Sequence, residues 1–134
     1  ELADSTGNYV PLAIKIAPDL DNDEIATMGQ TMLDHKIDAV IATNTTLDRA
    51  TVEGHPNAKE AGGLSGAPLT DHATKVIARF NAGLGKDVPI IGAGGIFSAE
   101  DALAKKAAGA SLVQIYTGFV YKGPALIHDI IRAW

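Results

Sequence analysis

The sequence lacks cysteine altogether, which excludes disulfide bonds, thiolate zinc sites and a cysteine nucleophile. Positive charge is also scarce, because 11 lysine and arginine residues stand against 16 aspartate and glutamate residues and leave a formal net charge of -5. Surfaces that bind nucleic acid or anionic lipid require a basic face. The charge balance therefore argues against nucleic acid as a partner and against a basic membrane-binding surface.

Long hydrophobic runs are missing as well. No segment approaches the roughly 20 apolar residues that span a bilayer, and the first residues, Glu1–Asp4, have neither the basic region nor the apolar core of a signal peptide. We therefore expect a soluble chain. Its 134 residues, of which 46% are hydrophobic and 20% charged, are typical of one globular domain.

Apolar runs and amphipathic stretches alternate four times along the chain. Nearly continuous apolar runs are typical of strands buried on both faces, and apolar residues at helical spacing predict the helices between them. The expected strands are 10–17, 39–42, 88–91 and 111–116, and the expected helices are 19–36, 69–84, 98–109 and a last one that begins near residue 124. Ser98 has the place of a helix N-cap, with Asp101 three residues later.

This alternation predicts the fold class. Four successive βα units imply an α/β protein with a parallel sheet and right-handed crossovers. A (β/α)8 barrel usually takes about 250 residues, so we expect half of such a TIM barrel, and a small doubly wound sheet is the alternative. Half a barrel exposes the inner face of its sheet and two strand edges, which favours pairing with another half.

Two glycine-containing loops predict a phosphate site. In a βα-barrel the site lies at the carboxyl ends of the strands, and the loops after the last two strands often hold phosphate. Gly92–Gly95 and Tyr116–Gly118 have these places in the sequence. Glycine lets the backbone approach a phosphate closely, and Thr117 adds a hydroxyl group. A tight turn explains either loop alone equally well, but the pair together favours phosphate binding.

Lys15 is the most informative single residue. It lies within a predicted buried strand, where an ammonium group must meet an anion or lose its charge. The alternative is a side chain that reaches solvent at the strand end. Near a flavin, a lysine would stabilise negative charge that develops on the reduced ring.

Short polar side chains follow the second predicted strand. Thr43–Thr46 combine hydrogen-bond donors and acceptors that suit a planar amide or imide substrate, and a polar turn is the alternative. The connection that follows, 48–68, is long for a compact domain, so we expect it to be functional and mobile without a partner or ligand. Its end, Gly62–Gly66, looks like another segment of close backbone approach.

The acidic cluster near residue 20 does not predict a metal site. Asp19, Asp21 and Asp23 have the spacing that opens a calcium loop, but Glu24 stands where the loop needs glycine and Gln30 where it needs a carboxylate. We interpret these acids as the start of a helix, where the macrodipole favours negative charge. The four histidines lack ligand spacing, and we expect no metal.

Five motifs in order along the chain closely resemble those of the class 2, quinone-dependent dihydroorotate dehydrogenases. The resemblance runs from about residue 11 to the end. The motifs are Ala13–Leu20, Ala42–Thr46, Gly62–Leu69, Ile90–Ile96 and Gln114–Phe119. It implies a (β/α)8 barrel that holds FMN, oxidises dihydroorotate to orotate in pyrimidine synthesis and passes the electrons to quinone, with this chain as its C-terminal half.

The resemblance also implies site residues. The positions expected to hold FMN are Lys15, Thr43, Gly66, Gly95, Tyr116 and Thr117, the last three around its phosphate. Asn44 and Thr45 fall on substrate-binding positions. In this family the catalytic base is a serine on a loop from the earlier half of the barrel, and Ser65 belongs to the flavin loop instead. We therefore expect no catalytic base in this chain.

The resemblance makes residues 1–134 a C-terminal half-barrel with part of the FMN and orotate sites. We expect it to be inactive alone, and the helices that admit quinone belong to the N-terminal region of the family. The parent enzyme would be peripheral on the cytoplasmic face of the cell membrane. The expected partner is the N-terminal half-barrel or a second copy of this chain. The alternatives are a self-associating structural module and another phosphate-binding barrel.

Overall fold

A computed structural model describes residues 5–85 and 87–134 of the chain. Four strands form one parallel sheet in the order β1-β2-β3-β4. They are β1 (Ala13–Ile16), β2 (Ala39–Ala42), β3 (Ile90–Ala93) and β4 (Ala110–Gln114). The predicted parallel α/β sheet is confirmed.

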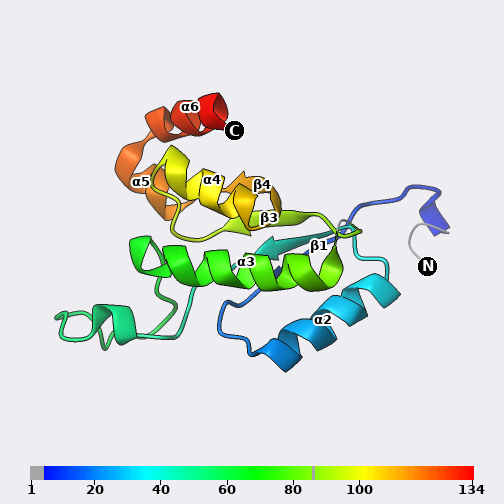
Figure 1. Ribbon diagram of the computed structural model, residues 1–134, viewed down its shortest axis with the longest axis horizontal. Helices are drawn as coiled ribbons and strands as arrows, with labels where there is room; N and C mark the ends of the chain where they lie inside the picture. Colours follow the sequence, from blue (N-terminus) through cyan, green and yellow to red (C-terminus); the bar gives the residue numbers. More distant parts are fainter. Residues whose placement is uncertain (1–4, 86) are drawn as a thin grey trace.

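Helices follow each strand and cover one face of the sheet (Figure 1). They are α2 (Asn22–Asp34), α3 (Thr70–Leu84), α4 (Ala99–Ala107), α5 (Thr117–Lys122) and α6 (Pro124–Ala133), with the short 3-10 helices η1 (Ala50–Val52) and η2 (Ala67–Leu69) before α3. In Figure 1, α2 and α3 lie beside each other and α5 and α6 lie beyond α4. None of the helices within the described residues has the length and apolar character to cross a membrane.

The core lies between the sheet and α2 and α3. Alternate strand residues point toward these helices, as the period of two in a strand requires. The fully buried residues of this layer include Val40, Ala42, Ile90, Val76, Ile77 and Phe80. A second, smaller cluster joins α4 to α6 through Ala102, Leu126 and Ile130. The apolar spacing predicted for 69–84 therefore marks the buried face of α3.

The prediction that the strands are buried on both faces is wrong. The sheet register aligns Lys15, Ile41, Ile91 and Leu112 in one row across the four strands. Lys15 is exposed, Ile41 and Ile91 are half-buried, and Leu112 is 60% exposed. This row lies on the face opposite the helices, because only one face of this sheet is covered by the chain itself.

Several predicted boundaries shift. The first strand begins at Ala13 and not at residue 10, because its partner β2 begins at Ala39. The third strand is 90–93 and not 88–91, so Gly92 belongs to the sheet. The structure also has a helix that the sequence did not predict, α5, directly after β4.

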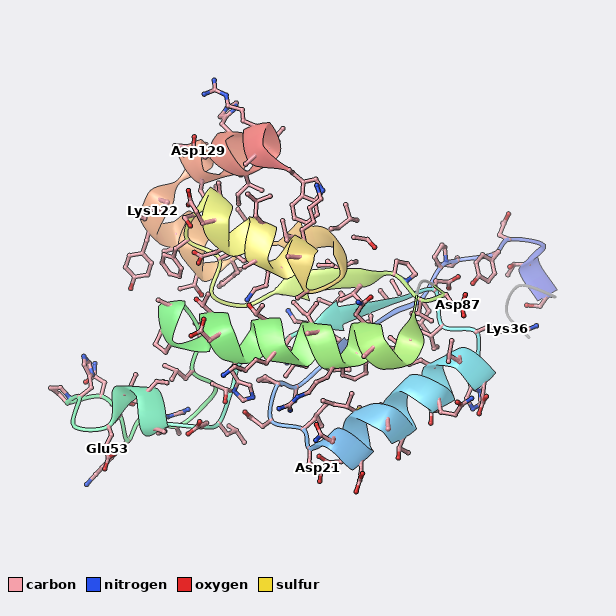
Figure 2. All side chains as sticks on the ribbon, in the orientation of Figure 1. Asp21, Lys36, Glu53, Asp87, Lys122 and Asp129 are labelled. Carbon is pink, nitrogen blue, oxygen red and sulfur yellow. The ribbon has the colours of Figure 1, made fainter. Side chains whose placement is uncertain are left out.

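The helix starts follow capping chemistry. Asp21 accepts a hydrogen bond from the Glu24 backbone N–H at 2.8 Å, and the Glu24 carboxylate accepts one from the Asp21 backbone N–H at 2.9 Å, which is a capping box. Ser98 caps α4 as predicted, by accepting from Asp101 N–H at 3.2 Å. Figure 2 shows Asp21 at the outer end of α2, and other labelled charged residues also lie at the periphery.

Asp19 is not part of the helix start, which corrects the interpretation of the acidic cluster. Its carboxylate accepts hydrogen bonds from the Thr46 hydroxyl and from the Leu47 backbone N–H, the latter at 2.7 Å. Asp19 therefore ties the loop after β1 to the loop after β2. The spacing of acidic residues alone could not show this long-range contact.

Candidate functional site

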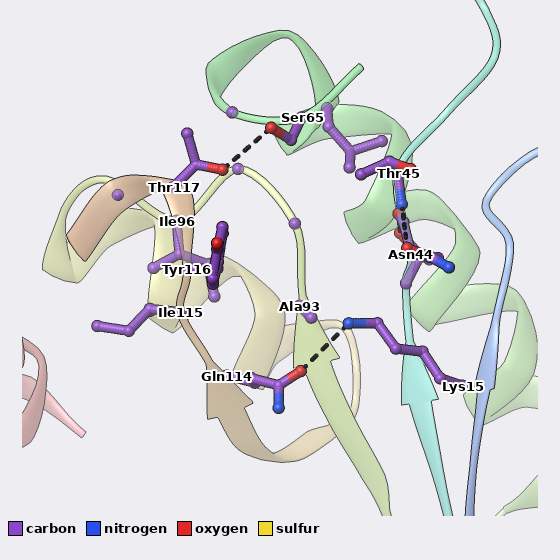
Figure 3. Close-up of a pocket in the computed structure, with 16 residues that line it drawn as sticks. Lys15, Asn44, Thr45, Ser65, Ala93, Ile96, Gln114, Ile115, Tyr116 and Thr117 are labelled. Atoms are coloured by element: carbon purple, nitrogen blue, oxygen red, sulfur yellow. Dashed lines mark hydrogen bonds between the residues drawn. The ribbon is translucent and has the colours of Figure 1, made fainter. Parts of the chain in front are cut away.

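A cleft of about 280 Å³ opens at the carboxyl ends of the four strands (Figure 3). Its walls come from Lys15 in β1, from the ends of β3 and β4 and the loops after β2, β3 and β4, and from the segment before α3. All eight predicted site residues line it: Lys15, Thr43, Asn44, Thr45, Gly66, Gly95, Tyr116 and Thr117. The topology therefore gathers residues from 15 to 117 into one place, as expected where parallel strands end at one edge.

Lys15 enters the cleft from the open face of the sheet. Its ammonium group donates a hydrogen bond to the Gln114 side-chain oxygen, Oε1, at 3.4 Å (Figure 3). The side chain is exposed, so the prediction that it must meet an anion or lose its charge inside a doubly covered strand is wrong. Gln114 was not anticipated from the sequence, because its proximity to Lys15 depends on the order of the strands.

The loop after β3 approaches the start of α3 very closely. Gly95 has a φ of +70°, and a Cβ atom there would lie 2.5 Å from the backbone nitrogen of Thr70. The Thr70 hydroxyl donates a hydrogen bond to the Gly95 carbonyl at 2.6 Å. Glycine is therefore required at this position both for the backbone conformation and for space.

The loop after β4 closes against the loop after β3. A Cβ atom on Gly118 would lie 1.9 Å from the carbonyl oxygen of Ile96. On the other side, the methyl group of Thr117 lies 3.4 Å from the position of a Cβ on Gly66. The Thr117 hydroxyl donates a hydrogen bond to the Ser65 hydroxyl at 3.1 Å (Figure 3). Three glycine-containing segments thus meet at one end of the cleft.

This end of the cleft carries unpaired backbone donors. Within residues 5–85 and 87–134, the backbone N–H groups of Gly95, Thr117 and Gly118 donate to no acceptor of the chain, although Gly95 and Gly118 are buried. Buried N–H groups nearly always have a hydrogen-bond partner. Their arrangement around one cleft is typical of a site that binds an anion through the backbone.

The other end of the cleft is formed by the residues after β2. Thr43 is buried, and its backbone N–H donates to the Ala93 carbonyl at 3.0 Å; the peptide bond before Thr43 is cis. Asn44 and Thr45 are exposed in the cleft, and the Asn44 side-chain oxygen accepts a hydrogen bond from Thr45 N–H at 2.9 Å (Figure 3). Both residues line the cleft.

The connection after these residues has internal structure. Thr46 and Leu64 form an isolated antiparallel bridge, with hydrogen bonds of 3.0 and 2.8 Å. Gly63 lies so close to Thr45 that a Cβ there would be 1.8 Å from the Thr45 hydroxyl. The predicted close-approach segment Gly62–Gly66 therefore packs on the polar residues after β2. Ser65 lines the cleft beside Gly66.

Comparisons with known proteins agree on one family. Residues 3–133 match the dihydroorotate dehydrogenase family. A dihydroorotate dehydrogenase (quinone) of Burkholderia cenocepacia is 62% identical over 132 residues, which cover 98% of this chain and 38% of that protein. The enzyme of the same name from Burkholderia thailandensis is 59% identical, with the same coverage. The chain thus spans well under half the length of these curated relatives.

Solved structures give the same result for the fold. The crystal structure of the Eimeria tenella dihydroorotate dehydrogenase in complex with ferulenol superposes with a TM-score of 0.88 at 36% identity and covers 96% of this chain and 34% of that one. The ligand-free form of the same enzyme also has a TM-score of 0.88. The four βα units are therefore a portion of a (β/α)8 barrel. By its match over residues 3–133, the chain belongs to the dihydroorotate dehydrogenase family.

Proposed function

We propose that this chain supplies the FMN-phosphate and orotate-binding part of a quinone-dependent dihydroorotate dehydrogenase in pyrimidine synthesis. The observation that carries the proposal is the cleft, where unpaired backbone N–H groups lie at one end and polar side chains at the other. The quinone designation of the relatives supports the choice of electron acceptor. Residues 1–134 act in this proposal as one half-barrel domain.

The residues present fit FMN. Its phosphate would be held by the N–H groups of Gly95, Thr117 and Gly118, and by the Thr117 hydroxyl once its proton turns from Ser65 to the phosphate, a donor set that suits a dianion. The cleft, at about 280 Å³, lies just below the roughly 300–1,000 Å³ typical of small-molecule sites. Bound FMN supplies a two-electron acceptor for dihydroorotate and a donor to quinone.

Lys15 and the residues after β2 orient the ligands in this proposal. The Lys15 ammonium, held by Gln114, would place a positive charge in the flavin site, where it would stabilise negative charge on the reduced ring. Thr43 and Gly66 shape the flavin site. Asn44 and Thr45 hydrogen-bond the amide and imide groups of the substrate ring.

The chain has no proposed catalytic base. Ser65 lies in the cleft, but its hydroxyl accepts a hydrogen bond from Thr117 at the phosphate end. We therefore do not assign it the removal of a proton from a substrate carbon. We therefore expect no dihydroorotate oxidation by the chain alone. Quinone binding, membrane association and pairing with an N-terminal half-barrel are proposals for the longer protein.

A comparison of FMN with riboflavin tests the proposal, because riboflavin lacks only the phosphate. We expect the purified chain to quench FMN fluorescence on binding and to bind riboflavin at least about tenfold more weakly. The Gly95→Ala variant should lose this preference, since its Cβ displaces the loop. Gly85→Ala is the matched control, because Gly85 has a φ of +60° but no atom within 4 Å of its Cβ position and lies outside the cleft.

Three results would contradict the proposal. Absence of FMN binding would overturn the flavin site. Equal affinity for FMN and riboflavin would overturn the assignment of the phosphate end. FMN binding without a change in the flavin absorption spectrum on addition of orotate would instead favour another phosphate-binding barrel, since Asn44 and Thr45 would then hold no substrate.

A further inference from the structure

Lys105 is a buried lysine that does not line the cleft. It lies on α4, none of its surface is exposed, and the sequence analysis gave it no role. Burial of an ammonium group costs free energy unless the group is well paired. Its surroundings are therefore more informative than those of an exposed lysine.

The contacts of Lys105 connect three elements. Its ammonium group donates hydrogen bonds to the Thr70 carbonyl at 2.6 Å and to the Thr74 hydroxyl at 2.5 Å, both on α3. The Thr74 hydroxyl in turn donates to the Thr70 carbonyl at 2.8 Å. The Lys105 Cβ lies 3.2 Å from the position of a Cβ on Gly92 in β3, so the stem of the side chain packs under this strand.

Thr70 links this cluster to the phosphate end of the cleft. Its carbonyl accepts from Lys105, while its hydroxyl donates to the Gly95 carbonyl at 2.6 Å. Gly95 lies directly against the Thr70 backbone and carries one of the unpaired N–H groups of the cleft. A displacement of Thr70 would therefore change the direction of the Gly95 peptide groups.

We propose that Lys105 is a positioning residue for an anionic ligand of the cleft: through Thr70, it holds the Gly92–Gly95 loop so that its backbone N–H groups face a phosphate. This inference rests on the proposed phosphate site and adds to it a residue that never touches the ligand. A buried methionine would fill the same space at lower cost, but it would leave Thr70 without the donated hydrogen bond.

Charge at Lys105 adds a second, titratable effect. Burial lowers the pKa of Lys105 from 10.5 to about 8, and the carboxylates of Asp101 on α4 and Asp71 on α3 oppose this change. Deprotonation weakens the hydrogen bonds that Lys105 donates to Thr70 and Thr74, because a charge-assisted hydrogen bond is stronger than a neutral one, so the loop can respond to the protonation of Lys105 within an accessible pH range.

The test compares Lys105→Met with Lys106→Met. Lys106 is the next residue, exposed, and its ammonium contacts the Trp134 ring and carbonyl away from the cleft. At pH 7 we expect Lys105→Met to bind FMN about tenfold more weakly and riboflavin with unchanged affinity, whereas Lys106→Met changes neither. A merely structural lysine would weaken both flavins equally or neither, and this result would overturn the proposal.

The route through Thr70 is tested with Thr70→Val, which removes the hydroxyl bonded to Gly95 but keeps the carbonyl bonded to Lys105. We expect this variant also to lose FMN affinity selectively. The double variant, Lys105→Met with Thr70→Val, should bind FMN no more weakly than the single variant with the larger loss, because both changes act on one link. Additive losses would show that Lys105 does not act through Thr70. If Lys105→Met fails to fold, Thr74→Val removes one of its two acceptors and should give a smaller selective loss.

Failure of the phosphate site itself would be recognised separately, because the unmodified chain would then bind FMN no more tightly than riboflavin. In that case the amide resonances of Gly95 and Ile96, followed by NMR without ligand, decide the role of Lys105. We expect them to shift with pH near 8 in the unmodified chain and to lose this dependence in both Lys105→Met and Thr70→Val. Identical resonances in all three chains would overturn the positioning role.

Discussion

At the residue scale, the structure exposes Lys15, which was expected to be buried, and buries Lys105, for which the sequence predicted no role. Lys15 lies in an apolar run and was predicted to be buried, but it is exposed because helices cover only the other face of its strand. Lys105 lies in an alanine-rich segment and is fully buried. Its spacing of three residues from the buried Ala102 was a helical signal, but alanines on every side of a helix do not define its apolar face.

The buried Lys105 predicts a pH dependence of stability. Its pKa in the folded chain, about 8, lies below the ordinary value of 10.5, so the unfolded chain binds more protons between these values and stability rises with pH across this interval. Between pH 8 and 10.5 we expect the free energy of unfolding to rise by about 2 kcal/mol more in the unmodified chain than in Lys105→Met. One pKa unit corresponds to about 1.4 kcal/mol, and screening by solvent removes part of the total.

Urea titrations at pH 7.5, 9 and 10.5 measure this difference. The pKa of Tyr9 is raised by its hydrogen bond to Asp38, and its effect on stability is opposite to that of Lys105. The stability that this hydrogen bond contributes is lost as pH rises through the pKa of Tyr9 in the folded chain. Tyr9 is present in both chains, so its effect cancels in the comparison. Parallel pH profiles for the two chains would mean that Lys105 is solvated in solution.

The candidate site was largely predictable at this scale. Gly95 and Thr117 could be found because glycine loops after consecutive parallel strands converge at one sheet edge. The family resemblance added the proposed division of these residues between flavin and substrate. Gln114 and Ser65 could not be found from the residues alone, because their side chains meet Lys15 and Thr117 across more than 50 residues of sequence.

At the element scale, the order of strands and helices followed from hydrophobic periodicity. Strand β2 and helix α3 agree with their predicted ranges within one residue. Helix α5 was missed because it has only six residues, and three of them, Phe119, Val120 and Tyr121, are exposed apolar residues. Such a helix has no amphipathic pattern to detect, and its apolar surface faces away from the core.

Arg49 organises the long connection before α3. Its guanidinium group donates hydrogen bonds to the backbone carbonyls of Thr46 and Asp48, at 3.1 and 3.3 Å, and to those of Glu60, at 3.4 Å, and Gly62. One side chain thus joins both ends of the excursion that Figure 1 shows beyond α3. The five donors of arginine in a rigid plane suit this role better than the ammonium of lysine.

Removal of this clamp should loosen the connection without unfolding the sheet. In Arg49→Met we expect amide hydrogen exchange at His55 and Ala58 to accelerate at least about tenfold, since local opening then costs less free energy, while exchange at Val40 stays unchanged. Arg79→Met, on the exposed side of α3, is the matched control. The same exchange data test the predicted mobility of 48–68. Unchanged rates in Arg49→Met would assign the order of the segment to the Thr46–Leu64 bridge instead.

At the scale of the whole molecule, the sheet has one covered face and one open face. The open face carries the row from Lys15 to Leu112, and β1 and β4 are both edge strands. The sequence predicted exposed edges from the number of βα units, but not which residues would face outward, because apolar strands look the same whether one or both faces are covered.

An open apolar sheet face and two free edges favour association of this chain with itself. We expect sedimentation velocity to show a monomer–dimer equilibrium at protein concentrations between roughly 1 and 100 µM, because weak apolar interfaces have dissociation constants in about this range. In Leu112→Lys the dissociation constant should rise at least about tenfold, because a charge buried in an apolar interface loses its hydration.

A matched variant separates the sheet face from the other apolar surface of the molecule. Ile131 is 69% exposed on α6, against 60% for Leu112 in the sheet, so Ile131→Lys introduces the same charge at a comparable exposure away from the strands. If the sheet face mediates association, Ile131→Lys dimerises like the unmodified chain and only Leu112→Lys remains monomeric. If only Ile131→Lys remains monomeric, the interface is helical. A concentration-independent monomer of the unmodified chain would show that the open face stays hydrated, with the ammonium group of Lys15 on the edge strand β1 as the charge that keeps it so.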